Sequence, residues 1–260
     1  MKKLWYLFKL GIKAVLRVVF AVISGGEECV ICGKKSFLYP LCRECRKSYL
    51  SIKNVEKDDL FKNRCKICGK ELLSTQETCF DCRIKPVVTH VDKMLPLFPY
   101  RIWNKELMFM WKSQEIRSLS LFFAKILNLV LQKLDSKVVI PVPPRKGKLQ
   151  QKGWDQIDEL CNLLEYIYGY KVLRILERST AMQQKKLGRE GRLNQIGKAY
   201  SVVPPSRFQK ALKPYKGTLP KNIILLDDVC TTGSTLESCS LVLKEVGIET
   251  ITGVTLFTVD

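Results

Sequence analysis

The sequence predicts an α/β fold in which a small cysteine-rich module precedes a domain built on a parallel sheet. Eight of the 11 cysteines form four C-x-x-C pairs in the first third of the chain. Beyond them, strand-like apolar segments alternate with helical ones, which is the pattern of parallel strands joined by helices. One apolar segment runs directly into two acids and a loop of small hydroxyl residues, IILLDDVCTTGST at 223–235. These three observations define the two parts of the chain.

The composition favours partners that carry negative charge. The 260 residues are 46% hydrophobic and 27% charged, as in ordinary globular proteins. In contrast, 44 Lys and Arg against 25 Asp and Glu leave a net charge of +19. Such an excess indicates nucleic acid, phosphorylated metabolites or an anionic membrane as partners, although a solvated lysine-rich surface would give the same total.

Residues 1–26 predict a basic amphipathic helix. The segment begins like a signal peptide, but Lys9, Lys13 and Arg17 interrupt its apolar stretch. On a helix these cations fall on one side, and the opposite side carries apolar residues, Leu4, Leu7, Val15, Val18 and Val22. The interior cations disfavour a membrane span. The helix is expected either to make a peripheral contact with anionic lipid or with a partner, or to pack on the protein's own core.

Residues 27–86 predict a double zinc ribbon. The leading set of four cysteines is repeated with nearly the same spacing, and glycine follows the first pair in both sets; the sets are Cys29, Cys32, Cys42 and Cys45, and Cys65, Cys68, Cys79 and Cys82. Four thiolates suit a closed, tetrahedral structural Zn²⁺ site, so two zinc ions are expected. Iron–sulfur ligation is the main rival. The remaining thiols, Cys161, Cys230 and Cys239, are isolated, which indicates a reducing, cytoplasmic location.

Residues 87–260 predict the α/β domain. In chain order we expect an extended segment at 88–100, helical structure over 104–134, a short strand KVVIPVPP, a helix at 154–167 and a strand at 171–176. A polar, basic loop at 177–200 follows, and then the strand IILLDD, a helix beginning at Ser234 and a last strand, ETITGVTLFTV. His90, the one histidine, has no partner motif and is interpreted as incidental.

The loop after IILLDD predicts a ribose 5-phosphate site. Ligands of parallel α/β sheets bind beyond the carboxyl ends of the strands. There a phosphate would find backbone N–H groups, a helix N-terminus, a glycine that allows close approach and several hydroxyls, from Thr231, Thr232, Gly233, Ser234 and Thr235. Asp227 and Asp228 would repel phosphate, so they suit the neutral hydroxyls of the sugar.

This motif resembles the PRPP-binding motif of type I phosphoribosyltransferases. Together with the cysteine module, PVPP, K-G-W-D-Q and Q-x-x-L-x-R-x-x-R-L-N, the chain resembles the ComF family of competence proteins over about residues 27–258. The resemblance implies a type I phosphoribosyltransferase-like sheet domain that binds PRPP with Mg²⁺ through Asp227, Asp228, Val229, Cys230, Thr231, Thr232, Gly233, Ser234 and Thr235. It also implies a pyrophosphate-side loop, Arg145, Lys146 and Gly147, and a flexible basic loop, Arg178, Gln184, Arg189, Arg192 and Asn194.

Two departures from the family pattern are visible. The family usually has G-F-N-Q where this chain has Gly153-Trp154-Asp155-Gln156, which brings an acid close to the pyrophosphate region. A glycine that is common after the preceding Lys-aromatic helix is absent around Trp111-Lys112-Ser113-Gln114. The first change is expected to weaken anion binding there.

The resemblance implies a cytoplasmic role in natural transformation, handling incoming single-stranded DNA beside a helicase partner. The alternatives are an active phosphoribosyltransferase that transfers the ribose 5-phosphate of PRPP to a nitrogen base, and a zinc-held scaffold with an empty site. No catalytic residue can be assigned, because no segment clearly supplies base recognition. The candidate DNA surface joins the loop at 177–200 to the first ribbon, with cations Lys34, Lys35, Arg43, Arg46 and Lys47 and aromatics Phe37, Tyr39 and Tyr49, which could equally fill a small ribbon core.

Overall fold

The computed structural model describes residues 2–144, 153–178 and 199–259, and it confirms the α/β class. The helices are α1 (Lys2–Ile23), α2 (Arg43–Leu50), α3 (Phe80–Ile84), α4 (Ile102–Lys112), α5 (Ser118–Leu131), α7 (Gln156–Tyr168), α10 (Pro205–Leu212) and α11 (Ser234–Glu245). The strands are β1 (Glu27–Glu28), β2 (Lys35–Ser36), β3 (Lys93–Pro99), β4 (Val138–Pro141), β5 (Lys171–Val172), β6 (Leu176–Arg178), β7 (Tyr200–Val202), β8 (Asn222–Cys230) and β9 (Thr250–Thr258). Three short 3₁₀ helices complete the list, η1 (Ser51–Asn54), η2 (Asp58–Phe61) and η3 (Lys213–Tyr215).

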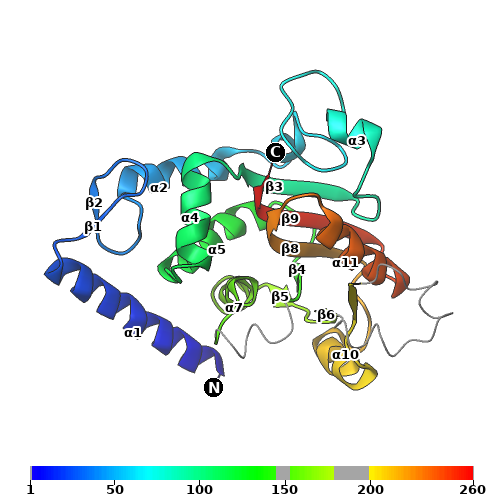
Figure 1. Cartoon of the computed structure of the whole chain (residues 1–260). Helices are drawn as coiled ribbons and strands as arrows, with labels where there is room; N and C mark the ends of the chain where they lie inside the picture. Colours follow the sequence, from blue (N-terminus) through cyan, green and yellow to red (C-terminus); the bar gives the residue numbers. More distant parts are fainter. Residues whose placement is uncertain (1, 145–152, 179–198, 260) are drawn as a thin grey trace.

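The central sheet has five parallel strands in the order β3-β9-β8-β4-β5 (Figure 1). β8 pairs with β4 on one side, where Leu226 lies opposite Pro141, and with β9 on the other, where Cys230 lies opposite Thr258. Because all strands point the same way, the carboxyl ends of β4, β8 and β9 lie at one edge of the sheet. A ligand site is expected at that edge.

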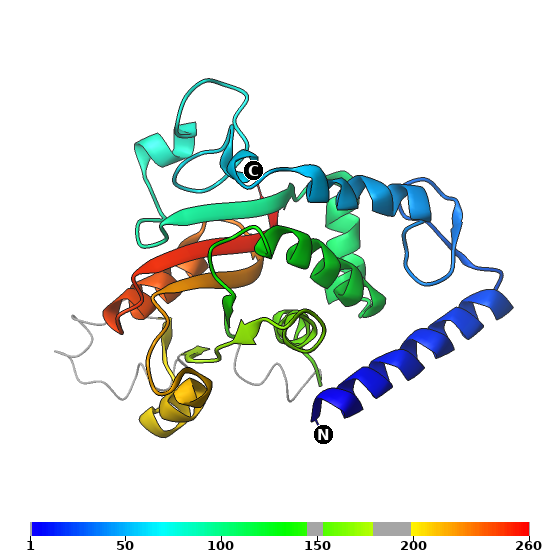
Figure 2. The same ribbon diagram turned by 180° about the vertical axis from the view of Figure 1, so that it is seen from behind.

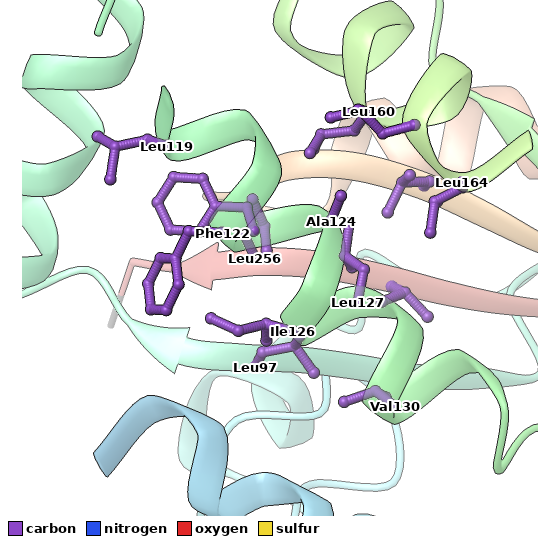
Figure 3. Close-up of a cluster of buried hydrophobic side chains, with 14 of the residues drawn as sticks. Leu97, Leu119, Phe122, Ala124, Ile126, Leu127, Val130, Leu160, Leu164 and Leu256 are labelled. Carbon is purple, nitrogen blue, oxygen red and sulfur yellow. The ribbon is translucent and has the colours of Figure 1, made fainter. Parts of the chain in front are cut away.

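Alternate residues of β8 pack into two different hydrophobic cores. Ile224 and Leu226 join a large cluster with α4, α5 and α7, whereas Ile223 and Leu225 join a second cluster with α11. Figure 3 shows the first cluster, in which Leu127 and Leu164 of two helices lie over the sheet. A strand buried on both faces explains why IILL shows no polar alternation in the sequence.

Two expected elements are divided in the structure. The helical region predicted over 104–134 is two helices, α4 and α5, separated by residues 113–117. Glu115 has a positive φ of 56°, which ends the helical path. The two helices remain tied, because the Trp111 Nε1–H donates to Ser120 Oγ at 2.8 Å. The break lets both apolar stretches cover the same face of the sheet. The strand predicted at 171–176 is also divided, into β5 and β6, and β6 pairs with β7 in a separate antiparallel ribbon.

The two cysteine ribbons pack on different parts of the sheet domain. Figures 1 and 2 place the first ribbon beside α4 and α5, and the second above β3. Leu41 of the first ribbon is fully buried in the large core cluster. In the second ribbon, Arg64 donates from Nη1 to the Pro96 carbonyl of β3 at 2.8 Å. A Cβ on Gly69 would lie 2.4 Å from the Met94 carbonyl oxygen, so the ribbon backbone is in tight contact with β3.

Candidate functional site

The loop between β8 and α11, residues 229–235, is called the hydroxyl loop below. β8 ends at Cys230 and α11 begins at Ser234, so the loop is a strand-to-helix turn at the carboxyl edge of the sheet, as the sequence predicted. Thr231, Thr232 and Ser234 are exposed, and the Thr232 and Ser234 hydroxyls lie 3.0 Å apart. Several hydroxyls and the first N–H groups of α11 therefore share one concave, solvent-facing turn. This combination suits a phosphate group.

The loop's thiol has a packing role. Cys230 is buried, and burial raises its pKa to about 11. A thiol with that pKa stays protonated near neutral pH and is a poor nucleophile. The Cys230 side chain therefore packs beneath the hydroxyl loop, in the protein interior, and has no reactive role.

Two adjacent acids precede the loop. The Asp227 carboxylate accepts a hydrogen bond from the backbone N–H of Asp228 at 2.8 Å. Although Asp227 keeps some contact with solvent, burial of its carboxyl and the neighbouring charge of Asp228 raise its pKa to about 8. The Lys112 ammonium, at the end of α4, lies 2.7 Å from Asp228 Oδ2. The acids are thus held in a site where one negative charge is already compensated.

Lys112 is a site residue that the sequence did not reveal. In the sequence it marks only the place where a family glycine is missing. In the structure the last turn of α4 brings its side chain to β8, more than a hundred positions along the chain. No local spacing could predict this pair, because it depends on how α4 crosses the sheet.

The segment that precedes β3, residues 88–90, holds the hydroxyl loop in place and is called the brace below. Glu237, in the first turn of α11, accepts hydrogen bonds from the backbone N–H groups of Thr89 at 2.7 Å and His90 at 2.9 Å. The Thr89 hydroxyl and His90 Nδ1 also contact its carboxylate, each at 2.5 Å. Burial acts to raise the pKa of Glu237, but these hydrogen bonds outweigh it and lower the pKa below its ordinary value. The interpretation of His90 as incidental is therefore wrong.

Glycine is required at position 233 both by the backbone conformation and by the neighbouring side chain of Val88. The φ of Gly233 is +83°, a left-handed conformation that disfavours other residues, and a Cβ built there would lie 2.4 Å from Val88 Cγ2. The sequence suggested that glycine lets the backbone approach an anion. The structure shows that the missing side chain would point at Val88 of the brace.

Replacing Gly233 with alanine should destabilise the protein by about 1–3 kcal/mol, from backbone strain and from contact with Val88. Adding Val88→Ala removes the methyl that the new Cβ would meet. The double variant should therefore lose less stability than the sum of the two single changes, which urea denaturation of all four proteins measures. Strictly additive effects would show that Val88 does not confine this position.

The pyrophosphate side is described only in part. Arg145, Lys146, Gly147, Gln184, Arg189, Arg192 and Asn194 lie outside the described residues. Arg178 belongs to β6, and its guanidinium lies over the ring of Tyr200 at 5.5 Å. It borders a cavity of about 290 Å³ at the end of β4, whose lining includes Pro141, Asp155 and Arg207.

Asp155, the acid that departs from the family pattern, is an N-cap. Its carboxylate accepts from the backbone N–H groups of Ile157 at 3.0 Å and Asp158 at 3.1 Å, at the start of α7. These donors and the positive end of the helix dipole compensate its charge. Asp155 is therefore expected to weaken anion binding at this position less than the sequence alone indicated.

The two sets of four cysteines form two compact clusters. In each, the ligand atoms lie within 4.8 Å of one another, and the pairing is the sequential one that the repeat predicted. The Sγ atoms of Cys32 and Cys42 are 3.6 Å apart, and those of Cys68 and Cys79 are 3.7 Å apart. Tetrahedral zinc with bonds of about 2.3 Å needs sulfurs about 3.8 Å apart. Each cluster could therefore hold a structural zinc ion.

The backbone repeats the same turn in both clusters. The N–H of Cys29 donates to Lys34 O and that of Gly33 to Cys29 O; the equivalent bonds in the second cluster are Cys65 to Lys70 and Gly69 to Cys65, all between 2.8 and 2.9 Å. Gly33 and Gly69 both have positive φ, 70° and 73°. This local geometry supports the duplication inferred from the sequence.

The proposed DNA surface is not continuous in the described residues. Figures 1 and 2 place the first ribbon and β6, which leads into the basic loop, on opposite sides of the domain. Tyr39 and Tyr49 are partly buried and pack on Phe122, at 6.0 and 5.7 Å between ring centroids. They belong to the core and are not free to stack on bases, whereas Phe37 remains 45% exposed.

The architecture defines a class of protein: a parallel α/β domain with two acids and a hydroxyl-rich loop at the carboxyl edge of its sheet, and two four-cysteine ribbons packed on it. No family model matches the sequence. Two competence proteins are similar to most of it. "Competence protein ComFC" of Streptococcus pneumoniae is 23% identical over 211 residues, 81% of this chain and 84% of its own. "Competence protein F" of Haemophilus influenzae is 26% identical over 223 residues, 81% and 87% of the two chains. These matches support the resemblance to the ComF family that the sequence motifs indicated.

Proposed function

We propose that this protein binds PRPP with Mg²⁺ at the hydroxyl loop and acts in DNA uptake, handling incoming single-stranded DNA in the cytoplasm. The observation that carries the proposal is the placement of Asp227 and Asp228 directly beside the hydroxyl loop at the carboxyl edge of the sheet. The names of the two relatives support the process, because both are competence proteins.

The residues divide the ligand between them. The hydroxyl loop and the N-terminus of α11 would bind the 5′-phosphate. The Asp227 and Asp228 carboxylates would accept hydrogen bonds from the ribose hydroxyls, and Asp228 would exchange Lys112 for them. Oxygen ligands of this kind also suit Mg²⁺, which, when bound with PRPP, neutralises part of the pyrophosphate charge. Lys112 stays close enough to compensate the remaining negative charge.

The cysteine clusters would hold two structural Zn²⁺ ions. The support is the tetrahedral spacing of their sulfurs and the burial of Cys29, Cys42, Cys65 and Cys82. Bound zinc would stabilise two ribbons too small to have a core of their own. Because the ribbons pack on α5 and β3, the ions would also stabilise the sheet domain indirectly.

The net charge supports a polyanionic partner such as single-stranded DNA, next to a helicase of the competence machinery. In the described part of the first ribbon, Lys34 and Lys35 are paired with Glu44 and Glu28, and these exposed pairs contribute little. Arg43 and Lys47 are exposed on α2 and complete the candidate contact with Phe37. DNA binding therefore rests on fewer residues than the sequence indicated.

An active phosphoribosyltransferase is the second candidate, and one cavity favours it. A space of about 380 Å³ lies between the hydroxyl loop and the second ribbon, and its lining includes Thr231, Thr232, Val88, Lys70 and Lys85. The size and the mostly apolar wall suit a planar nitrogen base. In that reaction the enzyme would mainly position PRPP and stabilise the departing pyrophosphate.

Calorimetry and gel shifts separate these candidates. PRPP with Mg²⁺ should bind without any base present, and no base in a screen should release pyrophosphate. A labelled single-stranded oligonucleotide should bind with an affinity that falls with salt by a slope of about −0.7 per phosphate contact. Base-dependent pyrophosphate release without DNA binding, even at low salt, would favour the enzyme. Failure to bind PRPP would exclude both.

A further inference from the structure

The outward face of α1 is apolar and exposed. We define this face by Trp5, Phe8, Ile12, Val15, Val19 and Ile23, whose spacing of three and four residues puts them on one side of the helix. Trp5 and Phe8 are each 59% exposed and Val15 is 62% exposed. A row of large apolar side chains this exposed on one element indicates an interaction surface.

The opposite face of α1 is anchored to the protein at both ends. Near the start, the ring of Tyr6 packs on Tyr166 of α7 with centroids 5.1 Å apart. Near the end, Arg17 donates to the Leu38 carbonyl at 2.9 Å and pairs with Glu27 at 2.5 Å, both in the first ribbon, and Ala21 is buried. The inner stripe is therefore occupied. The helix cannot turn its outward face inward without losing these contacts.

The charge on α1 is of one sign. Its sequence, KKLWYLFKLGIKAVLRVVFAVI, contains no acidic residue. Lys9 and Lys13 are exposed beside the outward face, and the Lys9 ammonium lies over the ring of Trp5 at 4.8 Å. Two copies of this chain that met through the outward face would bring like charges together, which opposes a dimer. A surface rich in negative charge would instead be complementary.

We propose that α1 lies in the surface of an anionic lipid bilayer, with its outward face among the acyl chains and Lys9 and Lys13 at the headgroups. An apolar face flanked by lysines and bearing an aromatic residue is the pattern of interfacial helices. Further exposed apolar residues flank this face and make the apolar surface wider than the narrow seam that fits a single partner helix; they are Leu4, Leu16, Val18, Phe20 and Val22. No helix in the described parts of the chain is long and apolar enough to cross a membrane. The contact is thus peripheral, and the inner stripe keeps the sheet domain beside the bilayer.

Vesicle flotation of the full-length protein tests this proposal. The protein should float with vesicles of phosphatidylcholine and phosphatidylglycerol in equal parts, and much less with phosphatidylcholine alone. Phe8→Asp with Val15→Asp should weaken binding at least about a hundredfold, because two buried apolar side chains are lost. Lys9→Glu with Lys13→Glu should weaken it roughly thirtyfold or more, since each lysine near such a surface contributes about fivefold. All of these positions are exposed, so the variants should stay folded, which circular dichroism checks.

The matched control is Leu73→Asp with Ile84→Asp, which places the same charges on exposed apolar residues of the second ribbon. This variant should bind vesicles like the parent protein. Equal loss in the control, or equal flotation with both lipid mixtures, would overturn the proposal. Failure of the parent protein to bind any vesicle would also overturn it. In that case, a dimer that is seen by sedimentation and lost in the Phe8 and Val15 variant would assign the face to a second copy of the chain.

Discussion

Asp227→Ala combined with Asp228→Ala should reduce the affinity for PRPP and Mg²⁺ by at least about a hundredfold in calorimetry. Each carboxylate would accept hydrogen bonds from ribose hydroxyls, and bonds to charged groups contribute about 1.5–3 kcal/mol each. Loss of both would also remove oxygen atoms that could hold the Mg²⁺ bound with PRPP. Folding should be little affected or improved, because the change removes a carboxyl whose pKa is raised by burial and by the neighbouring Asp228, and this gain offsets the lost pair between Asp228 and Lys112.

Asp58→Ala with Asp59→Ala is the matched control for this change. These are also two adjacent aspartates, but they lie exposed on η2, away from the sheet edge. They change the net charge by the same amount, so the control shows whether net charge alone alters binding of the anionic ligand. If both double variants bind PRPP as the parent does, the ribose role of Asp227 and Asp228 is wrong.

The pH dependence of PRPP binding gives an independent check. In the proposed site ribose binding needs the Asp227 carboxylate, while in the free protein burial and the charge of Asp228 raise its pKa to about 8, which favours the protonated acid. Binding should therefore release a proton, and affinity should rise between pH 6 and about pH 8. The folding stability is expected to change with pH in the opposite direction to the affinity. An acid whose pKa is raised in the folded state contributes stability below its ordinary pKa, and this contribution is lost as pH rises toward 8.

Cys65→Ser with Cys68→Ser should remove one metal ion of two, unfold the second ribbon and weaken PRPP binding. Zinc in small modules contributes on the order of 10–16 kcal/mol to folding, so two lost ligands cannot be tolerated locally. The effect should reach the hydroxyl loop, because the second ribbon leads directly into the brace. There Val88 lies against Gly233, and the Thr89 backbone N–H donates to Glu237. Metal analysis, limited proteolysis and calorimetry measure the three consequences.

The comparison variant is Cys29→Ser with Cys32→Ser. It should also lose one ion, but the first ribbon packs on α4 and α5, and its buried residues belong to a different core cluster from Val88 of the brace. PRPP affinity should therefore fall less than in the second-ribbon variant. Equal losses of affinity would contradict the coupling through the brace, and retention of two ions in either variant would contradict the sequential four-cysteine sites.

The sequence predicted those features that depend on local spacing. The C-x-x-C repeats determined which cysteines cluster, and the run from Ile223 to Thr235 predicted a buried strand, a turn and a helix start. Pairs that depend on packing were missed. Lys112 reaches Asp228 from α4, and Glu237 binds His90 from α11, over separations of more than a hundred residues. For Tyr39 and Tyr49 the sequence left both exposure and packing open, because an aromatic in a ribbon can be either, and only the position of α5 decides.

The position of β3 has a consequence for synthesis of the chain. Among the strands that the structure describes, β3 is the first in the central sheet, yet it is an edge strand that pairs with the last of them, β9, so Lys93 lies opposite Thr252. Ribosomes deliver the chain from the N-terminus, and β3 must wait unpaired until β9, more than 150 residues further along the chain, has been synthesised. Its apolar residues would be exposed to chaperones or to aggregation during that time. Closing so long a loop also makes this the slow step of folding, and a chain that stops before residue 250 would leave the edge open permanently.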